Sequence, residues 1–237
     1  MERLLASVAG LVLLLSGCTS DDEAKGSEPA ATTMTTTASG RDGLPGERVE
    51  IYPYAGARLA VVGVAAEDTL HVRTGPGVEF DVAFDLQPLA THAVATGHNR
   101  SVADGGFWSE ITADGRTGWA NSSYLLQRGQ TTDVTAALFP TPAERAKADS
   151  MDDLGRAVAR HRASTEPSPR IVVVDGPTVG DLGEITVDVI GLGDDAQSGE
   201  RLKVFAEPLP ARPRFTVRTV EATALCSRGV TEDGLCV

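Results

Sequence analysis

The chain has 237 residues, and its 21 basic and 33 acidic residues give a formal net charge of −12. This charge argues against nucleic acid and anionic lipid as partners, because both would repel an acidic protein. No segment after residue 18 is long and apolar enough to cross a membrane, and the roughly 180 residues that follow residue 50 suffice for two small domains.

The first 17 residues predict a cleaved secretion signal. Arg3 precedes an apolar run over residues 4–15, which is shorter than the roughly 20 residues that a membrane span needs. The stretch Leu-Ser-Gly-Cys that ends at Cys18 resembles the lipobox of bacterial lipoproteins. The resemblance implies that Cys18 is lipidated and that the lipid anchors the protein to a membrane of the bacterial cell envelope, outside the cytoplasm. The alternative is an ordinary signal peptide with a chance cysteine.

Residues 18–50 are expected to form a disordered tether behind that anchor. From residue 19 to about residue 47 the chain is rich in Thr, Ser, Ala, Gly and acidic residues and has almost no large apolar side chains. Such a segment buries too little surface to offset the entropy of ordering. A flexible chain of about 30 residues reaches on the order of 30 Å, which would lift the following domain towards the cell wall.

Residues 59–127 predict a small β-barrel or sandwich. Short runs with alternating hydrophobicity are separated by Gly, Asp and Asn, and they are too short for helices. The runs cover residues 59–65, 70–72, 80–86, 91–97, 107–111 and 117–120. Asp114-Gly115 is a strong hairpin signal, whereas residues 99–106 are expected to form a longer loop.

Residues 141–237 predict a second domain in which a helix covers an antiparallel sheet. Thr141 and Glu144 frame a capping box with Pro at the first helical position, and Ser150 offers a second helix start. Four alternating runs follow, at residues 171–175, 184–191, 201–207 and 215–225. In the second run, Ile185, Val187 and Val189 are expected to face the core, with Thr186 and Asp188 on the other face. The expected fold class is therefore mainly β with an α+β part.

The cysteines predict one disulfide. If lipid occupies Cys18, then Cys226 and Cys236 remain as an even pair in an exported chain. Closing so short a loop stabilises the fold by roughly 2.5 to 3 kcal/mol in the chain-entropy model. A metal site is the alternative, but no histidine lies near these cysteines in sequence.

Two motifs in residues 59–127 resemble the bacterial SH3-like domain, a small barrel of exported envelope proteins. They are LHVRTGPG at residues 70–77 and GRTGWANSSYL at residues 115–125, and the aromatic run FWSEI joins them. His71 stands where this family typically has asparagine. The resemblance implies binding to peptidoglycan or to an envelope protein. The candidate ligand-binding residues are His71, Arg73, Trp108, Trp119 and Tyr124.

The same motifs carry a local structural expectation. Leu70 and Val72 should face the core, and His71 and Arg73 should face outwards. Pro76-Gly77 fits the central pair of a type II turn. For Trp119, packing in the core is favoured over contact with a ligand. The last part of the chain, with VGDLGEITVDVIGLGDD and LCSRGV, resembles the tails of exported lipoproteins without known activity, and it carries no function by itself.

No constellation of catalytic residues stands out. A cysteine peptidase lacks its free thiol, and no Gly-x-Ser-x-Gly elbow is present. Asp152-Asp153 and Asp194-Asp195 fit a helix start and a turn better than an acid and base pair, and His92 with His98 makes a weak zinc site. We therefore expect a non-catalytic, lipid-anchored binding protein without cofactor or metal. The alternative is an accessory or regulatory subunit of an envelope enzyme or secretion complex, with the barrel as a spacer; a hydrolase ranks third.

Overall fold

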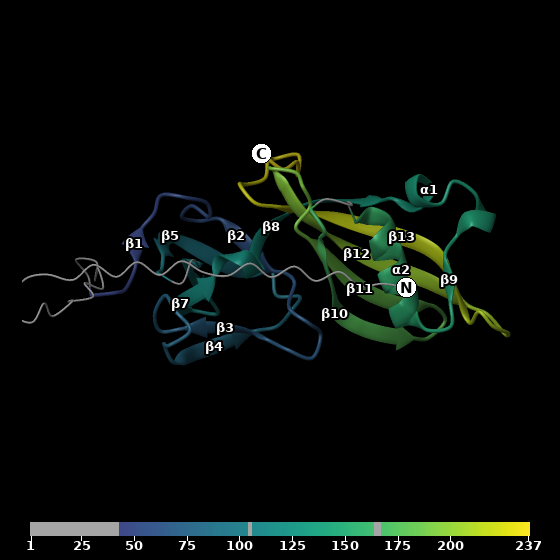
Figure 1. Cartoon of the computed structure of the whole chain (residues 1–237), viewed down its shortest axis with the longest axis horizontal. Coiled ribbons are helices and arrows are strands. Elements are labelled where there is room, and N and C mark those ends of the chain that lie inside the picture. Colours follow the sequence, from purple (N-terminus) through teal and green to yellow (C-terminus); the bar gives the residue numbers. More distant parts are fainter. Residues whose placement is uncertain (1–42, 104–105, 164–166) are drawn as a thin grey trace, which may run out of the picture. The chain divides into compact units, whose positions relative to one another are not determined.

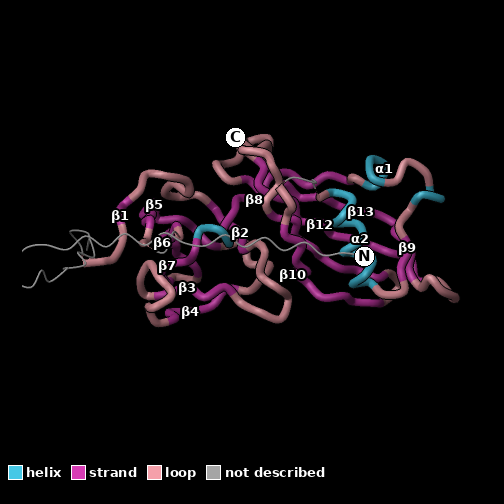
Figure 2. Tube along the Cα trace, in the orientation of Figure 1, coloured by secondary structure: helices cyan, strands magenta, loops and turns pink. Residues whose placement is uncertain are grey.

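The computed structural model describes residues 43–103, 106–163 and 167–237. The predicted signal over residues 1–17, Cys18 and the tether up to residue 42 lie outside these ranges. The described residues belong to one compact unit. Strands dominate them, and every pair of neighbouring strands is antiparallel (Figure 2). The prediction of a mainly β fold is confirmed.

The N-terminal module comprises residues 43–126. Its strands are β1 (Glu47–Arg48), β2 (Arg58–Val61), β3 (Leu70–Arg73), β4 (Val82–Leu86), β5 (Ala93–Ser101), β6 (Phe107–Ala113) and β7 (Arg116–Asn121). They pair in the order β2-β5-β6-β7-β3-β4, with β1 alongside β5. Among the described strands, no pairing joins β4 back to β2, so the sheet does not close into the barrel that the sequence predicts.

Alternation along these strands builds the core of the module. Leu70 and Val72 of β3 are buried beside Phe84, Leu86 and other apolar side chains, because every second residue of a strand points to the same face. Asp114 and Gly115 form the tight turn between β6 and β7, with φ of 49° and 73°. Positive φ at both central residues is what a type I′ hairpin turn requires, and the sequence predicts a hairpin here correctly.

The N-terminal module begins at residue 43, before the end of the tether predicted over residues 18–50. Residues 99–101 continue β5 instead of forming a loop, and β1 pairs with them. The Arg100 side chain is buried, and its guanidinium donates to the backbone carbonyls of Leu44, Pro45 and Gly46. The expected disorder is therefore wrong for residues 43–50. Composition could not reveal this, since one buried arginine from a distant strand holds the segment.

The C-terminal module is an antiparallel sheet of six strands with helices. Its elements are β8 (Leu125–Asp133), α1 (Thr135–Leu138), the 3-10 turn η2 (Pro142–Glu144), β9 (Lys147–Ala148), α2 (Met151–Arg162), β10 (Arg170–Val179), β11 (Gly183–Ile190), β12 (Gln197–Pro208) and β13 (Phe215–Cys226). The sheet order is β10-β11-β12-β13-β8, with β9 beside β13. Figure 1 shows α2 lying against the strands β10 to β13.

The local signals for α2 hold. Ser150 caps the helix, because its Oγ accepts from the backbone N–H of Asp153 at 3.1 Å. Met151, Leu154 and Val158 recur at helical spacing, so they share one face of the helix, and all three are buried against the sheet. Gly155 lets the helix approach closely, since a Cβ there would lie 2.9 Å from Cγ2 of Ile185. The capping box at Thr141 also forms, although it starts only a single 3-10 turn.

Strand β8 connects the two modules without a break. Its first residues pair with β2, through Leu125 and Leu126, and its later residues pair with β13. The domain boundary predicted after residue 127 therefore falls inside a strand. A small apolar cluster, with Ala60, Val62, Leu126 and Leu225 buried, lies between the two larger cores.

A buried ion pair also lies at this junction. Asp188 is fully buried, and its carboxylate accepts from Arg201 at 2.7 and 2.8 Å and from the backbone N–H of Gly63 at 2.8 Å. Arg201 Nη2 further donates to the carbonyl of Val61 at 2.8 Å. As the sequence predicts, Asp188 lies on the face of β11 that points away from the core of the C-terminal module. At this junction the N-terminal module covers the face that carries Asp188.

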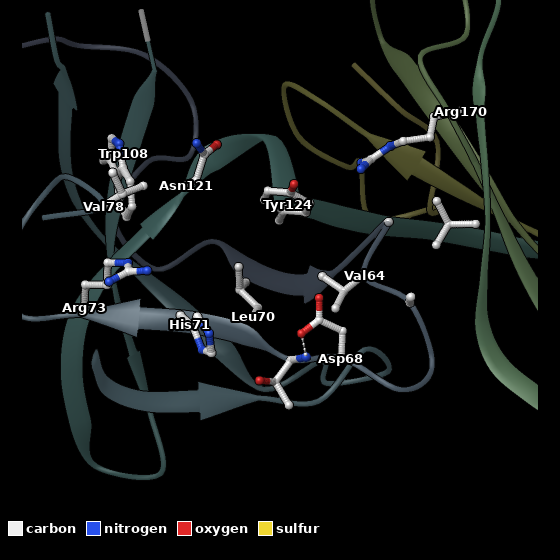
Figure 3. A pocket seen from close by; sticks show the side chains of 14 residues that line it. Val64, Asp68, Leu70, His71, Arg73, Val78, Trp108, Asn121, Tyr124 and Arg170 are labelled. Atoms are coloured by element: carbon white, nitrogen blue, oxygen red, sulfur yellow. Dashed lines mark hydrogen bonds between the residues drawn. The ribbon is translucent and has the colours of Figure 1, made fainter. Parts of the chain in front are cut away.

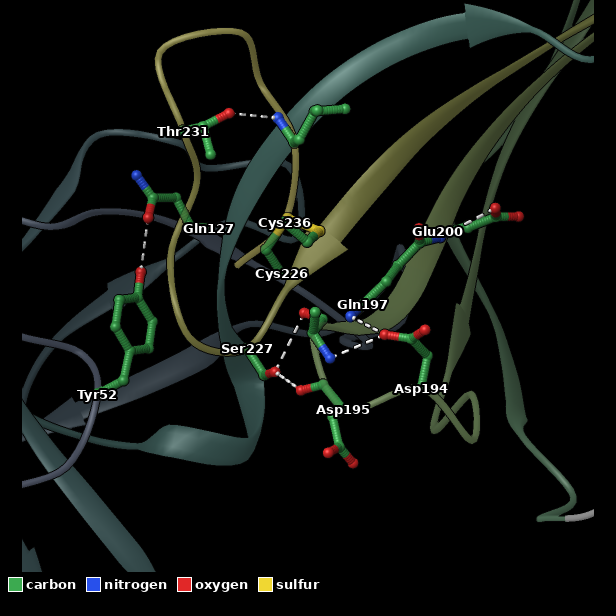
Figure 4. The surroundings of a disulfide bond; sticks show 12 residues. Tyr52, Gln127, Asp194, Asp195, Gln197, Glu200, Cys226, Ser227, Thr231 and Cys236 are labelled. Carbon is green, nitrogen blue, oxygen red and sulfur yellow. Dashed lines mark hydrogen bonds between the residues drawn. A yellow bond between two sulfur atoms is a disulfide. The ribbon is translucent and has the colours of Figure 1, made fainter.

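The C-terminal segment is held back onto the sheet. A disulfide joins Cys226 to Cys236, the pair that the sequence predicts, with 5.2 Å between their Cα atoms (Figure 4). The backbone N–H of Gln130 donates to the carbonyl of Gly234 at 2.8 Å, which fixes the disulfide loop to β8. Nearby, the Tyr52 hydroxyl donates to Gln127, and burial raises the pKa of Tyr52 to about 12.

Candidate functional site

A groove of about 530 Å³ opens where β3, the end of β7 and β10 approach one another. Its lining includes His71, Arg73, Trp108 and Tyr124, which are four of the five ligand-binding candidates from the sequence. Figure 3 shows these side chains together with Asp68 and Arg170 around the same hollow. The rest of the lining is Gly63, Val64, Ala65, Thr69, Leu70, Val78, Asn121 and Val172.

His71 presents its imidazole to solvent beside a carboxylate. Leu70 and Val72 point into the core, so His71 falls on the outer face of β3. Its Nδ1 lies 2.5 Å from Oδ1 of Asp85, directly across on β4, and both side chains are about half exposed, at 48 and 47%. This pairing orients the ring and leaves Nε2 as the second polar atom that a ligand can meet.

Arg73 lies at the end of β3, half buried, opposite Trp119 of β7. Its Nη1 donates to the carbonyl of Phe80 at 2.7 Å, so the guanidinium braces the loop that follows. Arg73 has no carboxylate partner among the described residues. Its remaining N–H donors suit the planar oxygens of a carboxylate.

The Gly-Pro-Gly corner after Arg73 differs from the predicted type II turn. Gly77 does not adopt the positive φ that such a turn needs, and residues 75–77 are all buried. A Cβ at Gly75 would lie 2.4 Å from the ring of Phe80. Glycine is therefore needed at position 75 because the loop backbone packs on an aromatic ring, which turn propensity alone does not reveal.

The two tryptophans have different surroundings. Both are buried, Trp108 with 4% and Trp119 with 5% of its surface exposed, but only Trp108 contributes to the groove. Trp119 lines a separate hollow with Arg100 and Glu110. The favoured packing role of Trp119 agrees with this position.

Tyr124 belongs to the short 3-10 turn η1 (Ser122–Tyr124), which Asn121 caps by accepting from the backbone N–H of Ser123. Its ring is half buried, and the guanidinium carbon of Arg170 lies 5.4 Å from the ring centroid. Arg170, the first residue of β10, is a site residue that the sequence did not predict. No local signal places the first residue of that strand over a tyrosine of the N-terminal module.

The other polar candidates serve the local structure. His92 and His98 each lie near a different carboxylate, that of Asp114 at 3.3 Å and that of Glu110 at 2.7 Å. Across the three described ranges, no group of three metal-ligating side chains gathers. Asp194 accepts from the backbone N–H groups of Gln197 and Ala196, which lowers the pKa of Asp194 and closes a turn.

Asp152 pairs with Arg156 along α2, and Asp153 contacts the helix cap. Both members of this adjacent acidic pair thus have partners on their own helix.

Within the described part of the chain, no helix has the length and apolar character that a membrane crossing requires. Comparison of the chain with protein-family models, with curated proteins and with solved structures finds no match.

Proposed function

We propose that this chain is a lipid-anchored binding protein of the bacterial cell envelope, without catalytic activity, and that its groove binds peptidoglycan. The observation that carries the proposal is the convergence of His71, Arg73, Trp108 and Tyr124 on one hollow of about 530 Å³. Concave sites of this size with a few convergent polar groups are typical of ligand binding.

Residues 59–127 are proposed to be SH3-like. The support is the pair of motifs at residues 70–77 and 115–125, which contribute Leu70, His71, Arg73, Asn121 and Tyr124 to the groove. The short antiparallel strands are compatible with such a module, although its sheet is open in the described residues. Because one fold serves many ligands, the choice of ligand rests on the groove and not on the resemblance.

A wall fragment suits the groove better than a folded protein partner. A stable protein interface buries roughly 800 Å² on each partner, usually over a broad surface. The groove is instead a confined hollow with aromatic and cationic side chains, which suit sugar rings, peptide side chains and carboxylates. The accessory-subunit alternative, with the barrel as spacer, is less well supported because Arg170 and Val172 of β10 line the same groove.

The test is retention on purified cell wall. The chain from residue 19 onwards, which contains the whole compact unit, is mixed with wall sacculi at physiological salt and sedimented. We expect co-sedimentation that weakens when Arg73→Gln removes the guanidinium charge. Arg160→Gln is the matched control, since Arg160 is an exposed arginine on α2 outside the groove. Equal retention of both variants, or none of the native chain, would contradict the proposal.

Anchoring is tested separately in living bacteria. The proposed lipid attachment at Cys18 predicts that a labelled fatty acid enters the native protein and that Cys18→Ala abolishes the label. The Cys226–Cys236 disulfide supports an oxidising, extracytoplasmic location. An unlabelled native protein recovered in the soluble fraction would contradict lipid anchoring while leaving wall binding open to its own test.

A further inference from the structure

The groove contains two guanidinium groups that come from different modules. Arg73 extends from β3, whereas Arg170 extends from the first residue of β10. Figure 3 shows them towards opposite ends of the groove, with Leu70 and Tyr124 between them in this view. A ligand that contacts both must therefore be extended and must bridge the two modules.

No carboxylate of the described residues neutralises either arginine. Arg73 donates to a backbone carbonyl and Arg170 lies over a ring, and neither forms an ion pair with a carboxylate of the described residues. The chain as a whole is acidic, with 33 acidic residues. Two arginines without ion-pair partners therefore make the charge of the groove differ from the charge of the chain. Guanidinium groups pair well with carboxylates, often through two parallel hydrogen bonds.

Asp68 places the opposite charge between them. Among the described residues that line the groove it is the one carboxylate, and it is exposed. Its Oδ1 accepts from the backbone N–H of Thr69 at 2.8 Å, which fixes the direction of the side chain. In the view of Figure 3 it lies between His71 and Arg170. A uniformly negative polymer would be repelled at this point, whereas an amino group would be attracted.

We propose that the groove binds a short acidic peptide that also carries a free amino group. One carboxylate pairs with Arg73, a second pairs with Arg170, and the amino group pairs with Asp68. The apolar surface of Leu70, Val78 and Tyr124 contacts the carbon skeleton between the charges. This inference rests on the proposed function, because it names the part of the wall that the same groove recognises.

The experiment compares three forms of one wall preparation. The first is untreated, the second has its carboxyl groups converted to amides, and the third has its amino groups acetylated. Binding of the chain from residue 19 onwards is measured on each by sedimentation, together with Arg170→Gln and the control Arg160→Gln. We expect amidation, acetylation and Arg170→Gln each to weaken binding by about tenfold, and Arg160→Gln to leave it unchanged.

A double comparison separates direct contact from a structural effect. If Arg170 pairs with a wall carboxylate, Arg170→Gln should cause little further loss on amidated wall, because the contact is already gone. Likewise, Asp68→Asn should matter on untreated wall and little on acetylated wall. Full and equal losses on treated and untreated wall would overturn the inference, as would unchanged binding after amidation.

The failure of this inference differs from the failure of the proposed function. Binding to all three wall forms with equal affinity would overturn the acidic-peptide ligand and leave wall binding intact. No binding to any form would overturn wall binding and the inference together. Capture of a defined envelope protein in place of wall, with Arg170→Gln abolishing that capture, would also overturn the peptide ligand.

Discussion

Loss of either Asp188 or Arg201 should destabilise the molecule strongly. The carboxylate of Asp188 is fully buried and accepts from both Arg201 and the Gly63 backbone. Removing one partner leaves the other charge buried without compensation, which typically costs 3 to 5 kcal/mol. We expect Asp188→Ala to lower the free energy of unfolding by roughly 3 to 5 kcal/mol in urea denaturation.

Asp195→Ala is the control for this prediction, because the Asp195 side chain is 92% exposed. Its effect should stay within about 0.5 kcal/mol. A loss of stability no larger for Asp188→Ala than for Asp195→Ala would show that the buried pair does not hold the junction.

Tyr52 should make the stability depend on alkaline pH. Burial raises its pKa from 10.0 to about 12, so the folded chain keeps the phenolic proton where the unfolded chain releases it. The stabilisation is therefore fully present below pH 10.0 and is lost as the pH rises towards 12. We expect the difference in unfolding free energy between the native chain and Tyr52→Phe to shrink over this interval.

Below the interval, Tyr52→Phe should be less stable by a constant amount, because it loses the hydrogen bond from the hydroxyl to Gln127. Chemical denaturation at several pH values checks both parts. A difference that does not change with pH would contradict the burial of the phenol.

At the scale of elements, α2 depends on its cap. Ser150 Oγ accepts from the Asp153 backbone N–H, which otherwise has no partner within the helix. We expect Ser150→Ala to lower stability by about 1 kcal/mol, and Ser150→Asn to preserve it. Thermal unfolding monitored by circular dichroism checks the pair, and equal melting temperatures for the two variants would rule out the cap as a contributor.

Elements with local signals are the ones that the sequence predicts well. Asp114-Gly115 specifies a hairpin turn, and Ser150 specifies a helix start, since both act through their own backbone neighbours. Strand alternation likewise places Leu70 and Val72 in the core. By contrast, β1 and residues 43–50 are held by backbone pairing with β5 and by the side chain of Arg100, and composition does not reveal contacts that are so distant in sequence.

The candidate site was predictable only in part for the same reason. His71, Arg73 and Tyr124 belong to the two sequence motifs at residues 70–77 and 115–125, and they meet in the groove. Trp119 does not line it, because its buried ring lies beside a separate hollow with Arg100 and Glu110. Arg170 belongs to the C-terminal module. It lies over Tyr124 because β8 pairs with strands of both modules and so holds the two modules together.

At the scale of the whole molecule, the disulfide should stabilise the C-terminal end. Cys226 and Cys236 are 10 positions apart, and the loop is also held by Gln130. We expect the double variant Cys226→Ala, Cys236→Ala to lose roughly 2.5 to 3 kcal/mol of unfolding free energy. Reduction of the native chain should have a similar effect, and an unchanged denaturation midpoint after reduction would contradict this role.

Two modules that share one strand are expected to unfold together. β8 pairs with both sheets, and the Asp188–Arg201 pair connects them through buried hydrogen bonds. A single compact unit of this kind supports a composite groove, because the distance between Arg73 and Arg170 is then set by the fold and not by a flexible linker.

The measurement that tests the central claim most directly is an NMR titration of the isotope-labelled chain from residue 19 onwards with soluble peptides released from purified cell wall. We predict that chemical-shift changes concentrate at His71, Arg73, Tyr124 and Arg170, and that Leu154 and Val158 of α2 stay unchanged. An absence of shifts at saturating peptide, or shifts that concentrate around α2 and spare the groove, would contradict the account.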